Sequence, residues 1–181
     1  MQSAIVHNKE VHIMRTIQQN VTEESVRAAL LDVMDPEIPN LSIVDLGIVR
    51  GVSVGEAEIE VELLPTFVGC PALEVMKESV QERLRELAPG HGITVKVTLE
   101  ETWTTDRISE RGREVLKSSG FAPPLRMPQG KLNLMQLMPV AECPYCGSRR
   151  TVMDNAFGPT LCRAIYYCTS CRQPFEQFKQ V

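Results

Sequence analysis

Two Cys-x-x-Cys pairs near the C-terminus restrict the fold of this chain more than any other feature. Cys143 and Cys146 form the first pair, with Gly147 after it, and Cys168 and Cys171 form the second. Two intervening residues allow one turn to present two sulfur atoms to one ion, and four thiolates from two such turns suit tetrahedral zinc. The spacing therefore predicts a metal-binding module, which has little apolar core and depends on the metal for folding.

The spacing is less informative about which metal is bound. Four cysteines also bind iron in rubredoxin-like sites or in iron–sulfur clusters. Cys162 is a further thiol in the same region, and as a candidate ligand it keeps that alternative open. A hairpin fits between the two pairs, and we expect its strands at residues 151–153 and 164–167.

Composition and charge exclude several classes of protein. The chain of 181 residues carries a formal net charge of -4 and is 43% apolar. The apolar content is sufficient for a hydrophobic core. The net negative charge provides no positive potential that would attract nucleic acid or an anionic membrane. The apolar runs of the chain are far shorter than the ~20 residues of a membrane span. The N-terminus lacks the apolar centre of a secretory signal, so we expect a cytoplasmic protein.

Hydrophobic periodicity before the cysteines predicts helices and strands in alternation. Helices are expected at residues 22–34, 71–88 and 109–118, and strands at 48–54, 57–63 and 93–99. In the second strand, Ile59, Val61 and Leu63 alternate with glutamates, which is typical of a strand with one buried face. Gly55-Glu56 suits a two-residue hairpin turn between the first two strands.

These elements predict an α/β (α+β) fold, with a small mixed three-stranded sheet, helices and a C-terminal zinc-ribbon-like module. The expected parts are a flexible N-terminal tail at 1–20, the α/β domain at 21–120, a proline-rich linker at 121–130 and the cysteine module at 131–181. Because the linker separates the two folded parts, we expect Cys143→Ser to unfold the module and spare the α/β domain.

Strand order predicts where a site would lie. The hairpin makes the first two strands antiparallel, and the helical crossover makes the second and third parallel. The loop at 35–45, the loop at 66–70 and the segment at 100–103 should therefore meet at one edge of the sheet. Open α/β sheets usually bind ligands at the carboxyl ends of their strands.

Cys70 is the most informative residue at that edge. It precedes the second helix, where the helix dipole lowers a thiol's pKa and favours a nucleophile or a soft-metal ligand. The alternative is a buried, inert thiol that fills a gap. Asp35, Glu37 and Asp45 offer carboxylates to the same edge, or they serve ordinary turn chemistry. Trp103 is either an exposed recognition residue or a packing residue.

Several motifs resemble a known family of small domains. They are Asp35-Pro36-Glu37-Ile38-Pro39, residues 42–49, Thr66 and Gly69-Cys70-Pro71. In this order they resemble the family that includes SufT and the eukaryotic cytosolic iron–sulfur targeting factors, over about residues 22–103. Further motifs extend the resemblance to nearly the whole chain, at residues 103–106, 120–124, 143–147, 157–162 and 174–176. These resemble the PaaD subunit family, encoded with the oxygenase that epoxidises phenylacetyl-CoA in aerobic phenylacetate breakdown.

The resemblance implies a site and its partners. Cys70 carries over as the family's reactive cysteine, with Asp35, Glu37, Asp45 and Thr66 around it. The expected cofactors are a structural zinc ion in the cysteine module and a transient iron ion or iron–sulfur cluster. The expected partners are the other epoxidase subunits, above all the iron–sulfur reductase subunit, and a homo-oligomer is a further option.

Two hypotheses of different classes follow. In the first, the protein is an accessory subunit that assists iron–sulfur cluster assembly or delivery to the reductase. In the second, it is a non-catalytic docking subunit of the epoxidase, held together by a structural metal. Catalysis by this chain is the weakest hypothesis, because the sequence contains neither paired Glu-x-x-His di-iron ligands nor a Gly-rich nucleotide fingerprint.

Overall fold

The structure is a computed structural model, and it describes residues 21–38, 40–124 and 140–179. The expected N-terminal tail at 1–20 and residues 125–130 of the expected linker lie outside the described residues. None of the described helices is long and apolar enough to cross a membrane.

The first helix, α2 (Glu23–Leu30), starts where the sequence predicts. Thr22 and Ser25 form a capping box, in which each side chain accepts a hydrogen bond from the other residue's backbone N–H. The helix ends four residues earlier than the predicted 34, because the backbone becomes extended before Pro36. Met34 pairs with Ser42 in an isolated bridge there.

The first sheet has the predicted topology. Its strands are β1 (Val49–Val54), β2 (Glu58–Leu63) and β3 (Gly92–Val97), in the order β1-β2-β3. β1 pairs antiparallel with β2, and β2 pairs parallel with β3, so Val49, Leu63 and Val97 lie side by side. The mixed three-stranded sheet is thus confirmed. The hairpin turn is one residue later than predicted, because Gly55 N–H donates to Glu58 O.

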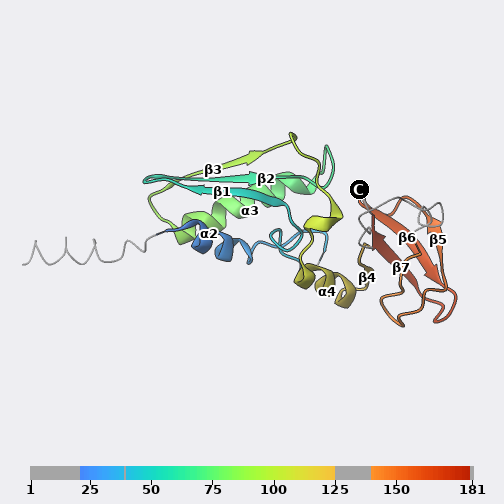
Figure 1. Cartoon of the computed structure of the whole chain (residues 1–181). Helices are drawn as coiled ribbons and strands as arrows, with labels where there is room; N and C mark the ends of the chain where they lie inside the picture. The colour runs from blue at the N-terminus through green and yellow to red at the C-terminus, as the bar shows by residue number, and fades with distance from the viewer. Residues whose placement is uncertain (1–20, 39, 125–139, 180–181) are drawn as a thin grey trace, which may run out of the picture.

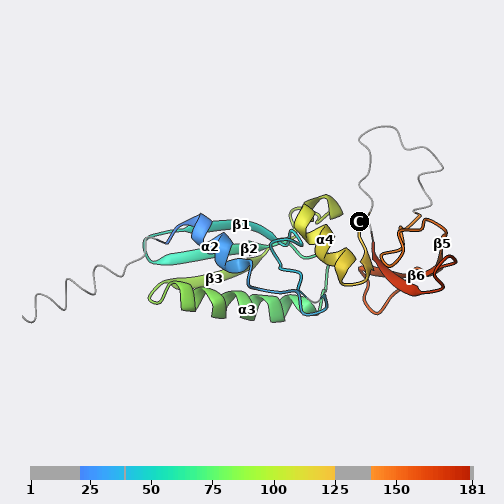
Figure 2. The same cartoon turned by 90° about the horizontal axis from the view of Figure 1, so that it is seen from below.

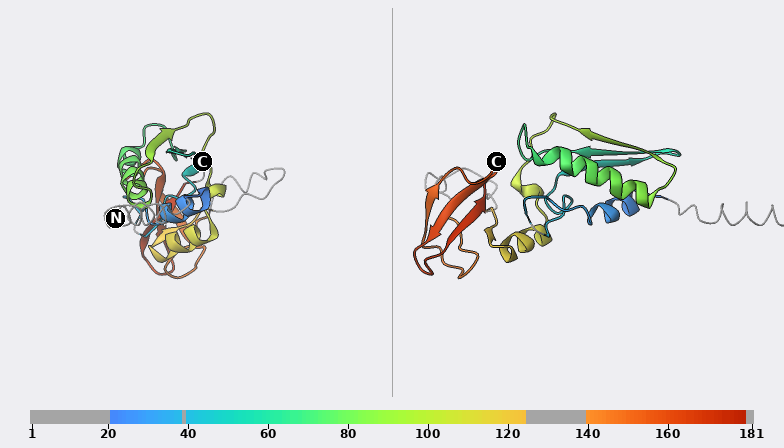
Figure 3. Two further views of the ribbon diagram at one scale, coloured as in Figure 1. Left: turned by 90° about the vertical axis from the view of Figure 1, so that its left-hand side faces the viewer. Right: turned by 180° about the vertical axis from the view of Figure 1, so that it is seen from behind.

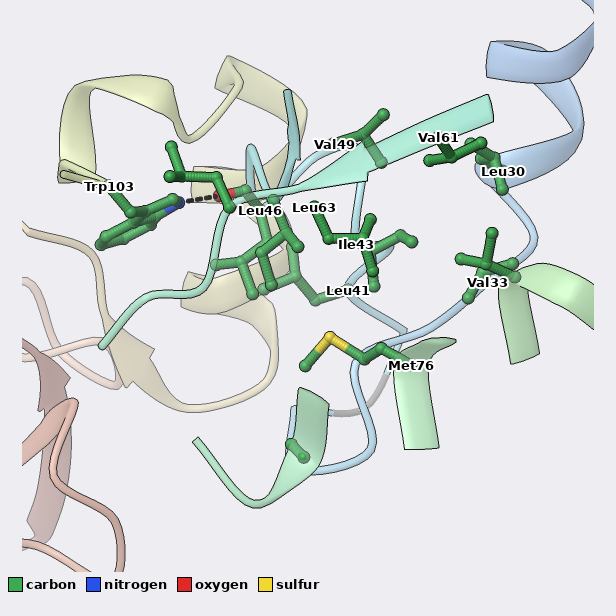
Figure 4. Close-up of a cluster of buried hydrophobic side chains, with 14 of the residues drawn as sticks. Leu30, Val33, Leu41, Ile43, Leu46, Val49, Val61, Leu63, Met76 and Trp103 are labelled. Atoms are coloured by element: carbon green, nitrogen blue, oxygen red, sulfur yellow. Dashed lines mark hydrogen bonds between the residues drawn. The ribbon is translucent and has the colours of Figure 1, made fainter. Parts of the chain in front are cut away.

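Two helices cover one face of this sheet. α3 (Ala72–Leu87) and α2 lie on the same side, with the opposite face open (Figures 1 and 3). The fully buried β2 residues Ile59, Val61 and Leu63 face these helices, as their alternation predicts. Figure 4 shows part of the resulting core, in which Met76 of α3 approaches the same cluster.

A second group of elements follows β3. The 3₁₀ turn η1 (Thr105–Arg107) leads to α4 (Glu110–Ser118), which Ser109 caps, close to the predicted helix at 109–118. Gly120 then takes a positive φ of 85° and turns the chain into β4 (Phe121–Ala122). The sequence places these last two residues in the linker, but they pair with the C-terminal sheet.

The C-terminal sheet contains four strands in the order β4-β7-β6-β5. β5 (Thr151–Asn155) and β6 (Arg163–Cys168) correspond to the two predicted strands and form an antiparallel pair. β7 (Pro174–Phe178) is not predicted from the sequence, and it connects β6 to β4. The cysteine module is therefore a small β-sheet domain, which we call the ribbon.

The ribbon packs against the first domain at the carboxyl ends of β2 and β3 (Figures 1 and 2). Phe178 and Cys162 of the ribbon belong to the same buried apolar cluster as the sheet and helices of the first domain. The expected linker at 121–130 stays a prediction, although within the described residues the ribbon and the first domain share this cluster. Phe121 and Ala122 of β4 pair with β7 and so belong to the sheet of the ribbon.

Candidate functional site

Four cysteines of the ribbon come together as one cage. The Sγ atoms of Cys143, Cys146, Cys168 and Cys171 all lie within 4.8 Å of one another. Two of the Sγ–Sγ distances, Cys143 to Cys171 and Cys146 to Cys168, are 3.6 Å. A zinc–sulfur bond of about 2.3 Å gives a tetrahedron with edges of about 3.8 Å, so the four sulfurs fit a structural tetrahedral ion.

The two turns that carry these cysteines have the same backbone geometry. In the first, Gly147 N–H donates to Cys143 O at 2.9 Å, and in the second Arg172 N–H donates to Cys168 O at 2.9 Å. Gly147 and Arg172 both adopt positive φ, at 69° and 62°. Glycine meets this requirement without strain, whereas Arg172 adopts it at a cost that the closed cage offsets.

Local hydrogen bonding prepares one of these thiols for a metal. The backbone N–H of Cys171 lowers the pKa of Cys168 to about 6, with Ser170 N–H adding to the effect. Burial raises the pKa of Cys171 to about 12. Since metal ions bind thiolates, the binding of a cation would displace thiol protons from the cage.

Cys70 lies where the strand order predicts, after the carboxyl end of β2 and directly before α3. Gly69 precedes it with a φ of 83°, which forms the turn out of the loop. Cys70 O accepts a hydrogen bond from Leu73 N–H at 3.2 Å. Its side chain is half-buried and packs against the main core cluster.

The electrostatics of Cys70 differ from the sequence expectation. Burial raises the pKa of its thiol, although the N–H of Ala72 at the start of α3 lowers it. The negative charges of Glu37, Cys162 and Asp35 raise the pKa further. The predicted lowering by the helix dipole is therefore wrong, since desolvation and like charges outweigh one turn of helix.

Asp35 and Glu37 approach the cysteine from the loop after α2. Asp35 is 9% exposed, and its Oδ1 accepts hydrogen bonds from the backbone N–H groups of Glu37 and Ile38. Burial raises the pKa of Asp35 despite these bonds. The charges of both carboxylates raise the pKa of Cys70, and their role in a Cys70 site stays a prediction.

Asp45 has a different set of contacts. Its Oδ1 accepts from Ser109 Oγ at 2.6 Å, its Oδ2 accepts from Ser42 Oγ at 3.1 Å, and Arg111 forms an ion pair with it at 3.1 Å. These partners attach the Asp45 loop to the start of α4. That Asp45 belongs to the Cys70 site stays a prediction. The contacts that the structure shows for Asp45 hold two segments of the first domain together.

Two further expected residues are buried. Thr66 is 7% exposed, in the loop between β2 and Cys70. Trp103 is 1% exposed, and its Nε1 donates to Leu46 O at 3.1 Å (Figure 4). Trp103 is therefore a packing residue, and an exposed recognition role is excluded.

Cys162 and Arg163 are the site residues whose position the sequence does not reveal. Cys162 lies outside the four-cysteine cage and is close enough to raise the pKa of Cys70. Arg163 pairs with Glu37 of the first domain at 3.4 Å and with Glu176 of β7 at 3.0 Å. These residues reach the carboxyl edge of the first sheet because the ribbon packs against the first domain. No local sequence pattern predicts this packing.

Comparisons with known proteins match both parts of the chain to families. Residues 23–97 match the family described as iron-sulfur cluster assembly protein, and residues 128–179 match the PaaD zinc beta ribbon domain. A protein of Escherichia coli (strain K12), named as a subunit of a "Putative 1,2-phenylacetyl-CoA epoxidase", is 39% identical over 156 residues, which are 84% of this chain and 89% of that protein.

Shorter relatives match the first domain. The "Fe-S protein maturation auxiliary factor" of Porphyromonas gingivalis is 33% identical over 101 residues, which are 55% of this chain and 92% of that protein. The crystal structure of a DUF59 domain from Bacillus anthracis has a TM-score of 0.49 and 29% identity, and covers 52% of this chain and 90% of its own.

Proposed function

Since this chain belongs to the PaaD family of phenylacetyl-CoA epoxidase subunits, we propose that it is an accessory subunit that assembles or delivers iron–sulfur clusters. Its client is the iron–sulfur reductase subunit of the epoxidase. The protein works in the cytoplasm, where free thiols stay reduced. Zinc occupies the ribbon cage and maintains its fold.

The observation that carries this proposal is the position of Cys70. The thiol lies just before α3, and the negative charges of Glu37 and Asp35 act on it. A thiol with neighbouring carboxylates offers one soft and several hard donors, which suits an iron ion on its way to a cluster. The iron–sulfur names of the relatives of this domain support the same function.

One thiol and two carboxylates do not form the four-ligand shell that generally retains a cluster. The cargo is therefore bound briefly and is shared with the client. We expect the isolated protein to show little cluster absorbance, and to form a Cys70-dependent complex with the cluster-free reductase.

A deletion strain tests the proposal. Without this protein, the reductase subunit should be purified with a reduced cluster content, measured by iron analysis and visible absorbance. Wild type should restore the clusters, and Cys70→Ala should not. Val68→Ala is the matched control, because Val68 lies in the same loop and is 78% exposed. Reductase with normal clusters in the deletion strain would refute the maturation role.

A docking subunit is the second candidate, and one observation favours it. The ribbon exposes apolar side chains that a partner protein would cover, namely Val152, Met153, Phe157 and Leu161. Exposed apolar residues in one small domain are typical of an interface. Co-purification with the active epoxidase at a fixed ratio, together with normal reductase clusters in the deletion strain, would select this role.

A further inference from the structure

We propose that the loop between β5 and β6, residues 156–162, is the docking element for the client protein, and that Phe157 and Leu161 enter an apolar groove bordered by carboxylates on that client. This inference rests on the proposed function, because it names the surface through which the client of the Cys70 site is recognised. It gives the ribbon a role in client selection in addition to its structural cage.

The ribbon is an addition to the domain that this chain shares with its shorter relatives. The Porphyromonas gingivalis protein is matched over 92% of its length by 55% of this chain. That match leaves almost no room in the shorter protein for a counterpart of the ribbon. Under the proposed function the cargo is bound in the shared domain, so the ribbon has a separate role, and recognition of a particular client is one that requires an added surface.

The 156–162 loop exposes two large apolar side chains within one short connection. Phe157 is 67% exposed, and Leu161 is 60% exposed. Aromatic side chains are enriched in the buried centre of protein interfaces, where a few well-packed residues contribute most of the binding energy. Phe157 is therefore the expected anchor of a contact with a partner, and Leu161 is the second contact.

Local hydrogen bonds fix the shape of this loop. Asn155 Oδ1 accepts from Phe157 N–H at 2.9 Å, and Arg163 O accepts from Gly158 N–H at 2.9 Å. Thr160 accepts twice from Arg163, at its backbone O from the N–H at 3.1 Å and at its Oγ1 from Nε at 2.8 Å. Because the loop is ordered before it binds, docking costs little conformational entropy.

The loop is continuous with the contact between the two domains. It ends at Cys162, whose backbone O accepts from Lys179 N–H at 2.8 Å, and Lys179 directly follows the interface residue Phe178. Arg163, the next residue after the loop, pairs with Glu37 of the first domain at 3.4 Å. A partner bound to the loop therefore lies next to the segment that carries Glu37, which the proposed function includes in the cargo site.

The charge beside the exposed ring determines what the partner offers. Lys179 Nζ lies 5.2 Å from the centroid of the Phe157 ring and donates to Ala156 O at 3.0 Å. Arg163 is buried, and its guanidinium is engaged by Glu37 and Glu176. The ammonium group of Lys179 therefore provides the positive charge next to the ring, and a groove that accepts the ring is complementary when carboxylates border it.

Calorimetric titration of the full, zinc-loaded chain with the purified, cluster-free reductase subunit tests the docking loop. Wild type should bind. Phe157→Ser should lower the affinity about 30-fold or more, which is the effect of an interface hot spot, and Leu161→Ser should lower it about fivefold or more. Both variants should retain the zinc content and the melting temperature of wild type, because the replaced side chains are exposed.

Val75→Ser is the matched control, because Val75 is a half-exposed apolar residue of α3 in the first domain. It should bind the reductase as wild type does. No binding by wild type, or equal binding by Phe157→Ser and wild type, would overturn the docking loop. Hydrogen exchange needs no variant: the reductase should slow exchange in residues 156–162, and unchanged exchange there would also overturn the proposal.

Two other occupants of the loop are distinguished by further measurements. Self-association of the chain that Phe157→Ser abolishes, measured by sedimentation without the reductase, would assign the loop to a second copy. Phe157-dependent binding to vesicles that contain phosphatidylserine would assign it to a membrane surface. Either result, without binding of the reductase, would overturn the assignment to the client.

The docking loop and the proposed function can fail separately. Normal reductase clusters in the deletion strain, with Phe157-dependent binding of the reductase, would refute the maturation role and leave the docking loop in place. Cluster loss in the Cys70→Ala strain, with full affinity of Phe157→Ser for the reductase, would refute the docking loop and leave the maturation role in place.

Discussion

The aromatic ring of Phe178, at the end of the ribbon's β7, packs against Trp103 of the first domain with 5.6 Å between ring centroids and 60° between planes. Both side chains are almost completely buried. Tilted aromatic pairs of this kind contribute beyond their buried area. The contact makes the ribbon part of the core of the first domain, and it couples their stabilities.

The first prediction concerns this contact. Phe178→Ala should lower the free energy of unfolding by about 3–5 kcal/mol, which is typical of a buried phenylalanine. It should also shift the fluorescence of Trp103, the single tryptophan of the chain, to longer wavelength. Phe157→Ala is the control, because Phe157 is 67% exposed. If Phe178→Ala lowered the free energy of unfolding no more than Phe157→Ala does in a denaturant titration, the domains would not be coupled through this contact.

The second prediction concerns the metal cage. Cys143→Ser, or removal of the metal with a chelator, should unfold the ribbon and also destabilise the first domain through the loss of Phe178 packing. Trp103 fluorescence and circular dichroism, recorded together during chelation, provide the measurement. Ribbon unfolding with unchanged Trp103 emission would instead support the independence of the domains that the sequence predicts.

The third prediction concerns the reactivity of Cys70. In zinc-loaded Cys162→Ser protein, Cys70 is the only cysteine outside the cage. Because burial raises the pKa of this thiol, its alkylation should be slow at neutral pH and should accelerate above the ordinary cysteine pKa of about 8.5. Glu37→Gln should move that rise to lower pH, since a negative charge is removed.

Glu56→Gln, in the hairpin loop between β1 and β2, is the control for this pH profile and should leave it unchanged. A profile of the Cys162→Ser protein that reaches its plateau below pH 7 would contradict a raised pKa. It would instead support the activated thiol that the start of α3 indicates.

The fourth prediction concerns Asp35. Since burial raises the pKa of this carboxyl, its ionised form is less favourable in the folded chain than in the unfolded chain, and it lowers stability at pH 7. Asp35→Asn retains an oxygen for the N–H groups of Glu37 and Ile38. The variant should therefore melt at a higher temperature than wild type at pH 7.

The difference should shrink as the pH falls through the raised pKa of Asp35, and it should vanish below the ordinary value of 3.8, where the carboxyl is neutral in both the folded and the unfolded chain. Melting temperatures measured from neutral to acidic pH test this dependence. Asp154→Asn, on the exposed β5, should change the melting temperature little at any pH. A lower melting temperature of Asp35→Asn at pH 7 would show that the ionised carboxylate is stabilising.

Local patterns account for the parts of the fold that the sequence predicts. The alternation in β2 identifies its buried face, because successive side chains of a strand point to opposite sides. Thr22 marks the start of α2 through its capping chemistry. The twin cysteine pairs predict the cage, because two turns of that spacing meet at one ion. In each case the determining interaction joins residues that are close in sequence or repeated with a fixed period.

The tertiary structure alone decides how the ribbon is placed and what surrounds Cys70. Cys162 is 92 positions after Cys70, counted from their residue numbers, and it reaches the site only because Phe178 and Trp103 join the two domains. The raised pKa of Cys70 has the same origin, since desolvation depends on which surfaces meet. The sequence determined the strands and the cage through local periodicity and spacing, whereas the composition of the site depends on packing between distant segments.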